Sequence, residues 1–452
     1  DGRRILAVSA WVNNAEVQLT IEPALVIDAT GDGIVAAAAG CDFRYGSEGK
    51  DEFGEVHAPE AGSPGDVMGN SLHFKTRDTG RDAPFTPPEW AEKLTDADYF
   101  YAQGRKPKDE RGGFWWVEMA KPFHPIDDAE QIRHELTRYV LGIWDWMKNH
   151  DPVMKKRART WALDWIGQVP GKRESRRVNG IYLMTENDIQ EKRVLEDEIA
   201  FGGWFLDLHT PGGLLADHSE PTTKENYSPY TERAVASYVG PYAIPLGSTI
   251  AKDVDNLFLA GRDMSLSHAA FGSVRVMETL AQVGQGVGTA AAIALEEGLA
   301  PAELPARAAD RIKQRMLRDG CFLLYTRNED PDDLARSATV RASSTAPVHG
   351  VSPGSPSFHE GLSIWWDQYN PMITERLDAT RGQLMAVGND RLDEVEVLLS
   401  NDSQEARTVR AAVRAVDHVW DYRLESGPAL FEGELEVNPG GPSWYSLPVA
   451  LD

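Results

Sequence analysis

The chain has 452 residues, of which 42% are hydrophobic and 26% are charged, a balance typical of a soluble globular protein with two or three domains. Its formal net charge of −24 argues against nucleic acid and anionic membranes as partners, because both are negatively charged. No apolar run reaches the roughly 18 residues that a membrane span needs.

The chain has only two cysteines, Cys41 and Cys321. Two cysteines so far apart predict buried thiols and no disulfide framework, which slightly favours the cytoplasm. No spacing of cysteine and histidine matches a set of metal ligands. The cellular location stays open beyond that.

The first predicted elements are two strands and a strand-turn-helix unit. Arg4–Trp11 and Glu16–Glu22 alternate like the strands of a β-meander. Leu25–Ile27 is an apolar strand, Thr30–Gly33 is a tight turn and Ile34–Ala39 begins a helix of small residues. Glycines in such a turn let backbone N–H groups approach a phosphate or a ribose. Taken alone, a glycine-rich turn is weak evidence for a nucleotide site.

Composition changes near Gly49, and residues 49–249 predict a separate α+β substrate or cap domain. Asn70–Thr76 and Phe114–Met119 are expected to be strands. Asp127–Asn149 has apolar residues at helical spacing and predicts a helix. Ala158–Ile166 is expected to be a short aromatic helix.

The stretch Asn256–Ala294 is the most informative part of the chain. The apolar strand Leu257–Ala260 leads into Gly261-Arg262-Asp263, and a loop carrying His268 follows. A long helix is expected from Gly272 or Ser273, with a face of small residues for close packing: Gly284, Gly288, Ala291 and Ala292. A strand end and a helix N-terminus that meet in one crevice form a site for a negatively charged group.

The last third of the chain predicts a helical linker at residues 301–337 and an all-β, sandwich-like accessory domain at residues 338–452. The linker contains an amphipathic helix, Pro305–Arg318. The accessory domain contains segments with strand patterns: Ala338–Ala342, Gln383–Val387, Glu394–Leu399, Val409–Val416 and Ala429–Val437.

Five segments together resemble one known family. They are Ile27–Gly33 (IDATGDG), Pro170–Asp188, Gly202–His209, Tyr242–Pro245 and Ala260–Met277 (AGRDMSLSHAAFGSVRVM). Their order is similar to that of successive blocks in the FAD-dependent oxidoreductase family, whose bacterial members are often labelled xanthan lyases. The resemblance covers approximately residues 5–340.

The resemblance implies an α/β fold, in which an FAD-binding Rossmann-like domain made of residues 1–48 and 250–300 carries the inserted cap. It implies FAD as the cofactor. The residues expected to contact FAD are Ala29, Thr30, Gly31, Asp32, Gly33, Gly261, Arg262, Asp263, Ser273, Val274 and Arg275.

Members of that family begin with a strand, a G-x-G-x-x-G turn and a helix that hold the FAD pyrophosphate. The nearest string here, Gly284–Gly288, has the wrong spacing and lies inside a predicted helix. We therefore expect that the FAD domain is incomplete, that the missing segment is truncated or lies on a second chain, and that this chain alone holds FAD poorly. The strand-like C-terminal residues SWYSLPVALD also point to truncation at that end.

Two residues of the last segment are candidates for flavin chemistry. Arg275, in the first turn of the expected long helix, would stabilise negative charge at the flavin pyrimidine edge. The alternative is an ion pair at the surface or between domains. His268 would relay a proton from its loop, since histidine titrates near neutral pH. The alternative is a hydrogen bond to the loop backbone.

Other candidates come from the predicted cap. On a strand, Asp207 and His209 would face the same side, and the carboxylate would make the imidazole a better base. A polar strand end is the alternative. Arg176, with Arg173 and Arg177, would bind an acidic substrate or the pyrophosphate, or form salt bridges to Glu174 or Glu186. Tyr242 would donate to a substrate oxygen, or only pack.

The resulting prediction is an FAD-dependent oxidoreductase that removes hydride from an alcohol or a sugar-like substrate, either a small molecule or a saccharide. Two alternatives remain open at this point. One is a carbohydrate lyase or glycoside-cleaving enzyme on the same flavin fold, and the other is a non-catalytic carbohydrate-binding protein.

Overall fold

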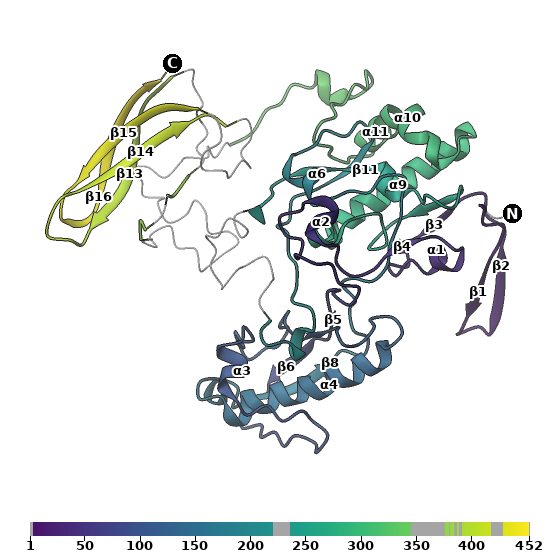
Figure 1. Ribbon diagram of the computed structural model, residues 1–452, viewed down its shortest axis with the longest axis horizontal. Helices are drawn as coiled ribbons and strands as arrows, with labels where there is room; N and C mark the ends of the chain where they lie inside the picture. The colour runs from purple at the N-terminus through teal and green to yellow at the C-terminus, as the bar shows by residue number, and fades with distance from the viewer. Residues whose placement is uncertain are drawn as a thin grey trace. The chain divides into compact units, whose positions relative to one another are not determined.

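The computed structural model describes residues 3–219, 236–344, 376–378, 380–383, 387, 391–416 and 428–451. The chain divides into two compact units, Asp1–Asp333 and Leu334–Asp452. Figure 1 shows the helices and strands of each. Among the described residues, no helix is long and apolar enough to cross a membrane.

The first unit begins with a β-hairpin. β1 (Val8–Val12) and β2 (Val17–Ile21) pair antiparallel, from Val8 opposite Ile21 to Val12 opposite Val17. The two predicted strands are therefore confirmed, but they form a two-stranded hairpin with shorter strands than the expected meander. Most of both strands is exposed, including the large apolar side chains of Trp11 and Ile21.

The glycine-rich turns follow two neighbouring strands. β3 (Val26–Asp28) and β12 (Leu257–Leu259) pair parallel, with Leu259 opposite Asp28. Strands that run in the same direction end at the same edge, so the turns after them lie close together. This confirms that the two segments share one sheet although the whole predicted cap separates them in sequence. α1 (Ile34–Ala38) begins after Gly33, whose φ of 61° is readily adopted only by glycine.

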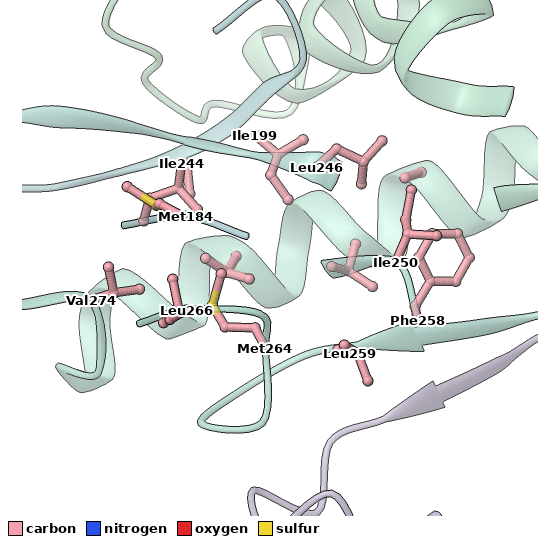
Figure 2. Packing of buried hydrophobic residues seen from close by; sticks show 14 of the residues in the cluster. Met184, Ile199, Ile244, Leu246, Ile250, Phe258, Leu259, Met264, Leu266 and Val274 are labelled. Atoms are coloured by element: carbon pink, nitrogen blue, oxygen red, sulfur yellow. The ribbon is translucent and has the colours of Figure 1, made fainter. Parts of the chain in front are cut away.

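A first hydrophobic core surrounds α9 (Met277–Glu297), which packs against β10 (Glu198–Gly202), the antiparallel partner of β11 (Tyr242–Pro245). Figure 2 shows the side chains that fill it, including Ile199, Ile244 and Phe258. The first core also takes in apolar residues between Val178 and Leu246, which the sequence pattern assigned to the cap. The boundary between cores therefore differs from the domain boundary that we expected.

The close approach of α9 to β10 depends on one glycine. A Cβ at Gly286 would lie 2.7 Å from Ile199 Cβ, whereas a Cβ at Gly284 or Gly288 would meet open space. Ala291 is buried, but Ala292 is exposed. The expected packing face was therefore wrong at Gly284, Gly288 and Ala292, because Gly286 is the glycine that faces the sheet.

A second hydrophobic core lies under α4 (Ala129–Asp145), which continues into a π-helical turn, Trp146–His150. Figure 1 shows this lobe around α4, β6 and β8. The strand pairs are β5 (Asn70–Ser71) with β7 (Glu118–Met119), and β6 (Phe74–Asp78) with β8 (Trp161–Ile166).

Two predictions in this lobe were wrong. The expected helix Ala158–Ile166 is largely strand β8, because its aromatic and branched side chains pair across β6 and cover the second core. The expected strand Phe114–Met119 is reduced to Glu118–Met119, since Phe114 and Trp116 turn inward and stack with ring centroids 5.2 Å apart. Sequence patterns of only six to nine residues do not distinguish a strand from a short helix or a loop.

The segment before α9 forms a separate short helix. α8 (His268–Val274) ends at Arg275, and α9 starts after the extended Val276. We expected one long helix from Gly272 or Ser273, which was wrong. The branched side chain of Val276 favours the extended backbone that separates the two helices.

β4 (Phe43–Arg44) pairs with β9 (Arg177–Val178). The other short elements in the described part of the first unit are α2 (Lys50–Phe53), α3 (Ala97–Tyr101), α5 (Met154–Arg157), α6 (Glu186–Gln190), η2 (Gly213–Leu215), η4 (Leu246–Thr249) and η5 (Pro301–Glu303). The amphipathic stretch Pro305–Arg318 is divided between α10 (Leu304–Arg307) and α11 (Ala309–Arg318). Leu304, Ile312 and Met316 of these helices pack into the first core.

The second unit contains four described strands after the turn η6 (Leu334–Ser337). β13 (Leu392–Asn401) pairs antiparallel with β16 (Gly440–Leu451), and β14 (Arg407–Arg414) with β15 (Ala429–Val437). Leu435, Leu447 and Val449 form the centre of its hydrophobic core. Three of the expected strands are thus present, whereas Ala338–Ala342 is not a strand. Part of Gln383–Val387 lies outside the described residues.

Candidate functional site

The turn after β3 is built around a buried carboxylate. Thr30 donates to Asp28 Oδ1 from its backbone N (3.0 Å) and its Oγ1 (2.7 Å), and Ala36 N donates to Oδ2 (2.9 Å). Thr30 Oγ1 in turn accepts a hydrogen bond from Ile34 N (3.0 Å). Asp28 therefore closes the turn and accepts hydrogen bonds from backbone N–H groups that would otherwise lack partners at the start of α1. Ala29 and Thr30 stay exposed at the top of the turn.

Asp32, in the same turn, collects cationic side chains from elsewhere. Lys172 Nζ forms an ion pair with Asp32, Ser175 Oγ donates to its Oδ1 at 2.8 Å, and Arg262 Nη2 lies 3.4 Å from Oδ1. Burial alone would raise the pKa of Asp32, but the hydrogen bonds from Lys172 and Ser175 and the charge of Arg262 outweigh it and lower the pKa. Asp32 is therefore an ionised anchor for the basic groups around the turn.

Two arginines place the other predicted segments against this turn. Arg262 lies directly on Gly31, where an added Cβ would be 2.6 Å from Arg262 Nη2. Arg176 Nη1 donates to the backbone oxygen of Asp32 at 3.1 Å, and its guanidinium carbon lies 5.2 Å from the Phe43 ring centroid. The structure thus brings Arg176, Thr30–Gly33 and Gly261–Asp263 together.

Asp263 is a buried acid with unused hydrogen-bonding capacity. Both of its carboxyl oxygens are buried, and neither has a hydrogen-bond partner among the described residues. Burial, followed by the negative charge of Asp28, raises the pKa of Asp263 to about 8. A carboxyl group that keeps its proton at neutral pH can donate one hydrogen bond and accept another. A ligand with hydroxyl groups would satisfy both functions.

Arg275 does not lie in the first turn of the long helix, as we expected, but caps the C-terminus of α8. Its Nη2 donates to the backbone oxygen of Asp207 at 3.0 Å and to Asp207 Oδ2 at 3.1 Å. Its Nε is buried without a hydrogen-bond partner among the described residues. α9 begins at Met277, about one turn later than the expected start at Gly272 or Ser273, so Arg275 precedes this helix and does not lie in its first turn.

Ser273, Val274 and Tyr242 lie in the protein interior. All three are fully buried. Tyr242 Oη and Ser273 Oγ are 2.6 Å apart, and Ser273 Oγ also donates to the backbone oxygen of Trp204. These contacts match the packing alternative for Tyr242, and they leave its hydroxyl group committed to Ser273.

His209 lies between two carboxylates. Its Nδ1 is 2.8 Å from Glu118 Oε1, and its Nε2 is 3.3 Å from Asp207 Oδ2. The expected strand at Asp207 and His209 is absent, so that premise was wrong, but the loop still brings the two side chains together. Burial lowers the pKa of His209, whereas the charge of Glu118 and the hydrogen bonds to both carboxylates raise it, and the net direction is upward.

His268 is the first residue of α8 and not a loop residue, which corrects the expected placement. Its Nδ1 lies 2.9 Å from Glu174 Oε1, and its backbone N donates to Glu48 Oε2 at 2.7 Å. Glu48 therefore supplies negative charge at the N-terminus of α8, where we expected a ligand. No hydrogen bond to His268 Nε2 is present among the described residues.

The other two arginines of the basic cluster form buried ion pairs. Arg177 contacts Glu48 (3.1 Å) and Glu174 (3.5 Å), and Arg173 contacts Glu118. The alternative that these arginines form structural salt bridges is therefore correct for Glu174. Glu186 instead pairs with His57, with 2.6 Å between Oε1 and Nδ1.

Sequence reasoning missed three of the acids that hold these groups, Asp28, Glu48 and Glu118, whereas it anticipated Glu174 as a salt-bridge partner of the arginine cluster. The available signal was an acid inside an apolar or glycine-rich stretch, such as Glu118 in FWWVEM. A carboxylate in such a setting must be paired when it is buried. Its partner lies far away in sequence, so the pattern alone does not identify it.

The family model described as "FAD dependent oxidoreductase" matches residues 1–316, which is more than half of the chain. No curated protein and no solved structure matches the chain.

Proposed function

The chain belongs to the FAD dependent oxidoreductase family, with FAD as its cofactor, and from this premise we propose that it removes hydride from a C–H bond of an alcohol or sugar-like substrate. The family supports the reaction type and the cofactor. The choice of substrate rests on the side chains described above and on the aromatic-rich second core.

The observation that carries this proposal is the meeting of the turns after β3 and β12 at Asp263. Its two unpartnered oxygens and its raised pKa fit a chain of hydroxyl groups such as the ribityl part of FAD. Lys172, Arg176 and Arg262 give the Thr30–Gly33 turn positive surroundings, as a phosphate-bearing cofactor requires. The residues present therefore fit FAD.

We assign Thr30–Gly33 and Gly261–Asp263 to holding FAD, with Ala29 at the edge of the turn. Ser273, Val274 and Tyr242 support the site from beneath, because their side chains are buried in protein contacts. Arg275, with its buried Nε, provides positive charge beside the end of α8 for the redox-active ring.

FAD supplies the acceptor for the hydride when it is bound. His268 takes the hydroxyl proton of the substrate at Nε2, so a carbonyl group forms as hydride leaves the carbon. Glu174 accepts the Nδ1 proton of His268 and thereby sets the tautomer that leaves Nε2 as the acceptor. Glu174 is itself fixed, because its Oε2 accepts a hydrogen bond from Met68 N at 3.0 Å.

A substrate screen tests the proposal. The purified protein with FAD is mixed without oxygen with alcohols, sugars and uronic acids, and the flavin absorbance at ~450 nm is followed. We expect one class of hydroxyl compound to bleach the band and to yield a carbonyl product. Unsaturated sugar products without bleaching would support the lyase alternative and contradict the proposal.

A further inference from the structure

Five charged side chains alternate in sign through the interior of the first unit. Arg173 Nη1 contacts Glu118 Oε2, and Glu118 Oε1 lies 2.8 Å from His209 Nδ1. His209 Nε2 lies 3.3 Å from Asp207 Oδ2, which is 3.1 Å from Arg275 Nη2. We call this set the charge row.

The charge row joins separate parts of the fold. Glu118 is in β7 of the second core, and Arg275 is at the end of α8 in the first core. The remaining members come from the segment before β9 and from the loop after β10. The side chains of Glu118 and His209 are only 1% and 5% exposed. Solvent therefore screens these charges weakly.

The geometry around His209 determines whether its imidazole ring carries one or two N–H protons. Ionised carboxylates only accept hydrogen bonds, and a neutral imidazole has one N–H. Because both ring nitrogens of His209 face carboxylate oxygens, both contacts are hydrogen bonds only in the imidazolium form. In a neutral ring, one of the two carboxylates would lose its donor.

We propose that Glu118 is a positioning residue that holds His209 as an imidazolium and thereby keeps Asp207 in place against Arg275. The effect on turnover rests on the proposed function, because Arg275 serves the redox site only there. The effect on His209 does not, since it follows from the charge row alone.

Glu118 is better placed than Asp207 for this role. Its oxygen lies closer to the ring, 2.8 Å against 3.3 Å. Its other oxygen is held by Arg173, and its backbone pairs with Ser71 in β5. The Trp115 ring packs edge-on against His209, with 5.3 Å between centroids, and covers the imidazole beside Glu118.

The pH dependence has a defined sign. The charged groups that face His209 are Glu118 and Asp207, with Arg173 and Arg275 behind them. The pKa of His209 in the folded protein is raised above 6.5 by the carboxylates. The stability that the imidazolium contributes is therefore fully present below the unfolded value and is lost as pH rises through the folded value.

Histidine NMR titration of the full chain tests the inference. The protein is labelled with ¹³C-histidine, and His209→Gln identifies the His209 signal. We expect His209 in the unchanged protein to titrate above 6.5. In Glu118→Gln, which keeps the shape but removes the charge, we expect a proton affinity lower by about tenfold or more, equal to one pKa unit. Glu118→Asp should restore part of the difference.

Glu130→Gln is the matched control, because Glu130 is exposed on α4 and pairs only with Arg133 among the described residues. It should leave the His209 titration unchanged. An unchanged His209 midpoint in Glu118→Gln, or a midpoint at or below that of an ordinary histidine in the unchanged protein, would overturn the inference. If Glu118→Gln does not fold, the His209 titration midpoints of the unchanged protein and of Glu118→Asp test the inference in the same way.

Kinetics separate this inference from the proposed function. If substrate reduces FAD, Glu118→Gln should lower kcat more than it changes KM and should shift the pH profile toward lower pH, with Glu118→Asp in between. If no substrate reduces FAD, the proposed function fails while the NMR result still decides the inference. A shifted His209 midpoint with unchanged kcat and pH profile would contradict the role of Glu118 in turnover.

Discussion

At the scale of single residues, the site uses neighbouring buried acids in opposite protonation states. Asp32 is surrounded by Lys172, Ser175 and Arg262 and is ionised, whereas Asp263 has a pKa raised to about 8. The difference comes from partners and not from burial alone, because burial raises the pKa of both groups. The ionised Asp32 holds the basic groups of the turn in place, whereas Asp263, when protonated, adds no negative charge beside a phosphate-bearing, hydroxyl-rich cofactor.

Asp263 should make the protein less stable as pH rises. Its folded pKa lies above its ordinary value of 3.8, so the folded state binds more protons between pH 3.8 and about 8. Asp263→Asn should therefore flatten the decline in the free energy of unfolding over this window, as measured by urea denaturation at several pH values. Asp32→Asn is the matched contrast, because it removes a carboxylate whose pKa is lowered, and it should reduce stability at neutral pH. Identical pH profiles for Asp263→Asn and the unchanged protein would contradict this assignment.

His268 should affect the chemical step more than cofactor binding. His268→Gln and Glu174→Gln should each keep the FAD content of the unchanged protein but slow the reduction of bound FAD by substrate, by about 10²-fold or more for His268→Gln. Anaerobic stopped-flow absorbance measures that rate. His134→Gln, at an exposed residue of α4 that stacks on Trp90, is the control. An unchanged reduction rate in His268→Gln would mean that His268 has only a structural role at the N-terminus of α8 and takes no part in proton transfer.

At the scale of elements, α9 depends on a single point of close approach to β10. Gly286→Ala places a Cβ 2.7 Å from Ile199 Cβ, so we expect a loss of about 1–3 kcal/mol in the free energy of unfolding from overpacking. Gly284→Ala and Gly288→Ala meet open space. They should stabilise the helix by about 0.5–1 kcal/mol, because alanine has the higher helix propensity. Urea midpoints that rank Gly286→Ala with the other two would contradict this packing.

The elements also show what the sequence could predict. The hairpin, the β3 and β12 strands and the β13–β15 strands follow short-range alternation and turn residues, and they were predicted. Strand β8 and the break at Arg275 were not, because each depends on tertiary pairing that a local window does not contain. The positions of Thr30–Gly33 and Gly261–Asp263 were predicted together through the family pattern. Glu118 was not, since its partners His209 and Arg173 are distant in sequence.

At the scale of the whole molecule, the first unit contains the candidate site. The family match to residues 1–316 falls entirely within Asp1–Asp333. Both hydrophobic cores that position the charge row also lie in this unit. We therefore assign the proposed oxidation to the first unit, and the second unit needs no part in it.

The most direct test of the proposed function is the anaerobic reduction of bound FAD by a substrate deuterated at the carbinol carbon. We expect stoichiometric bleaching of the flavin band, one carbonyl product for each flavin reduced, and slower bleaching with deuterium because the C–H bond breaks in this step. A product that forms without bleaching, or bleaching whose rate does not change with deuterium even in a single turnover, would contradict hydride removal by this protein.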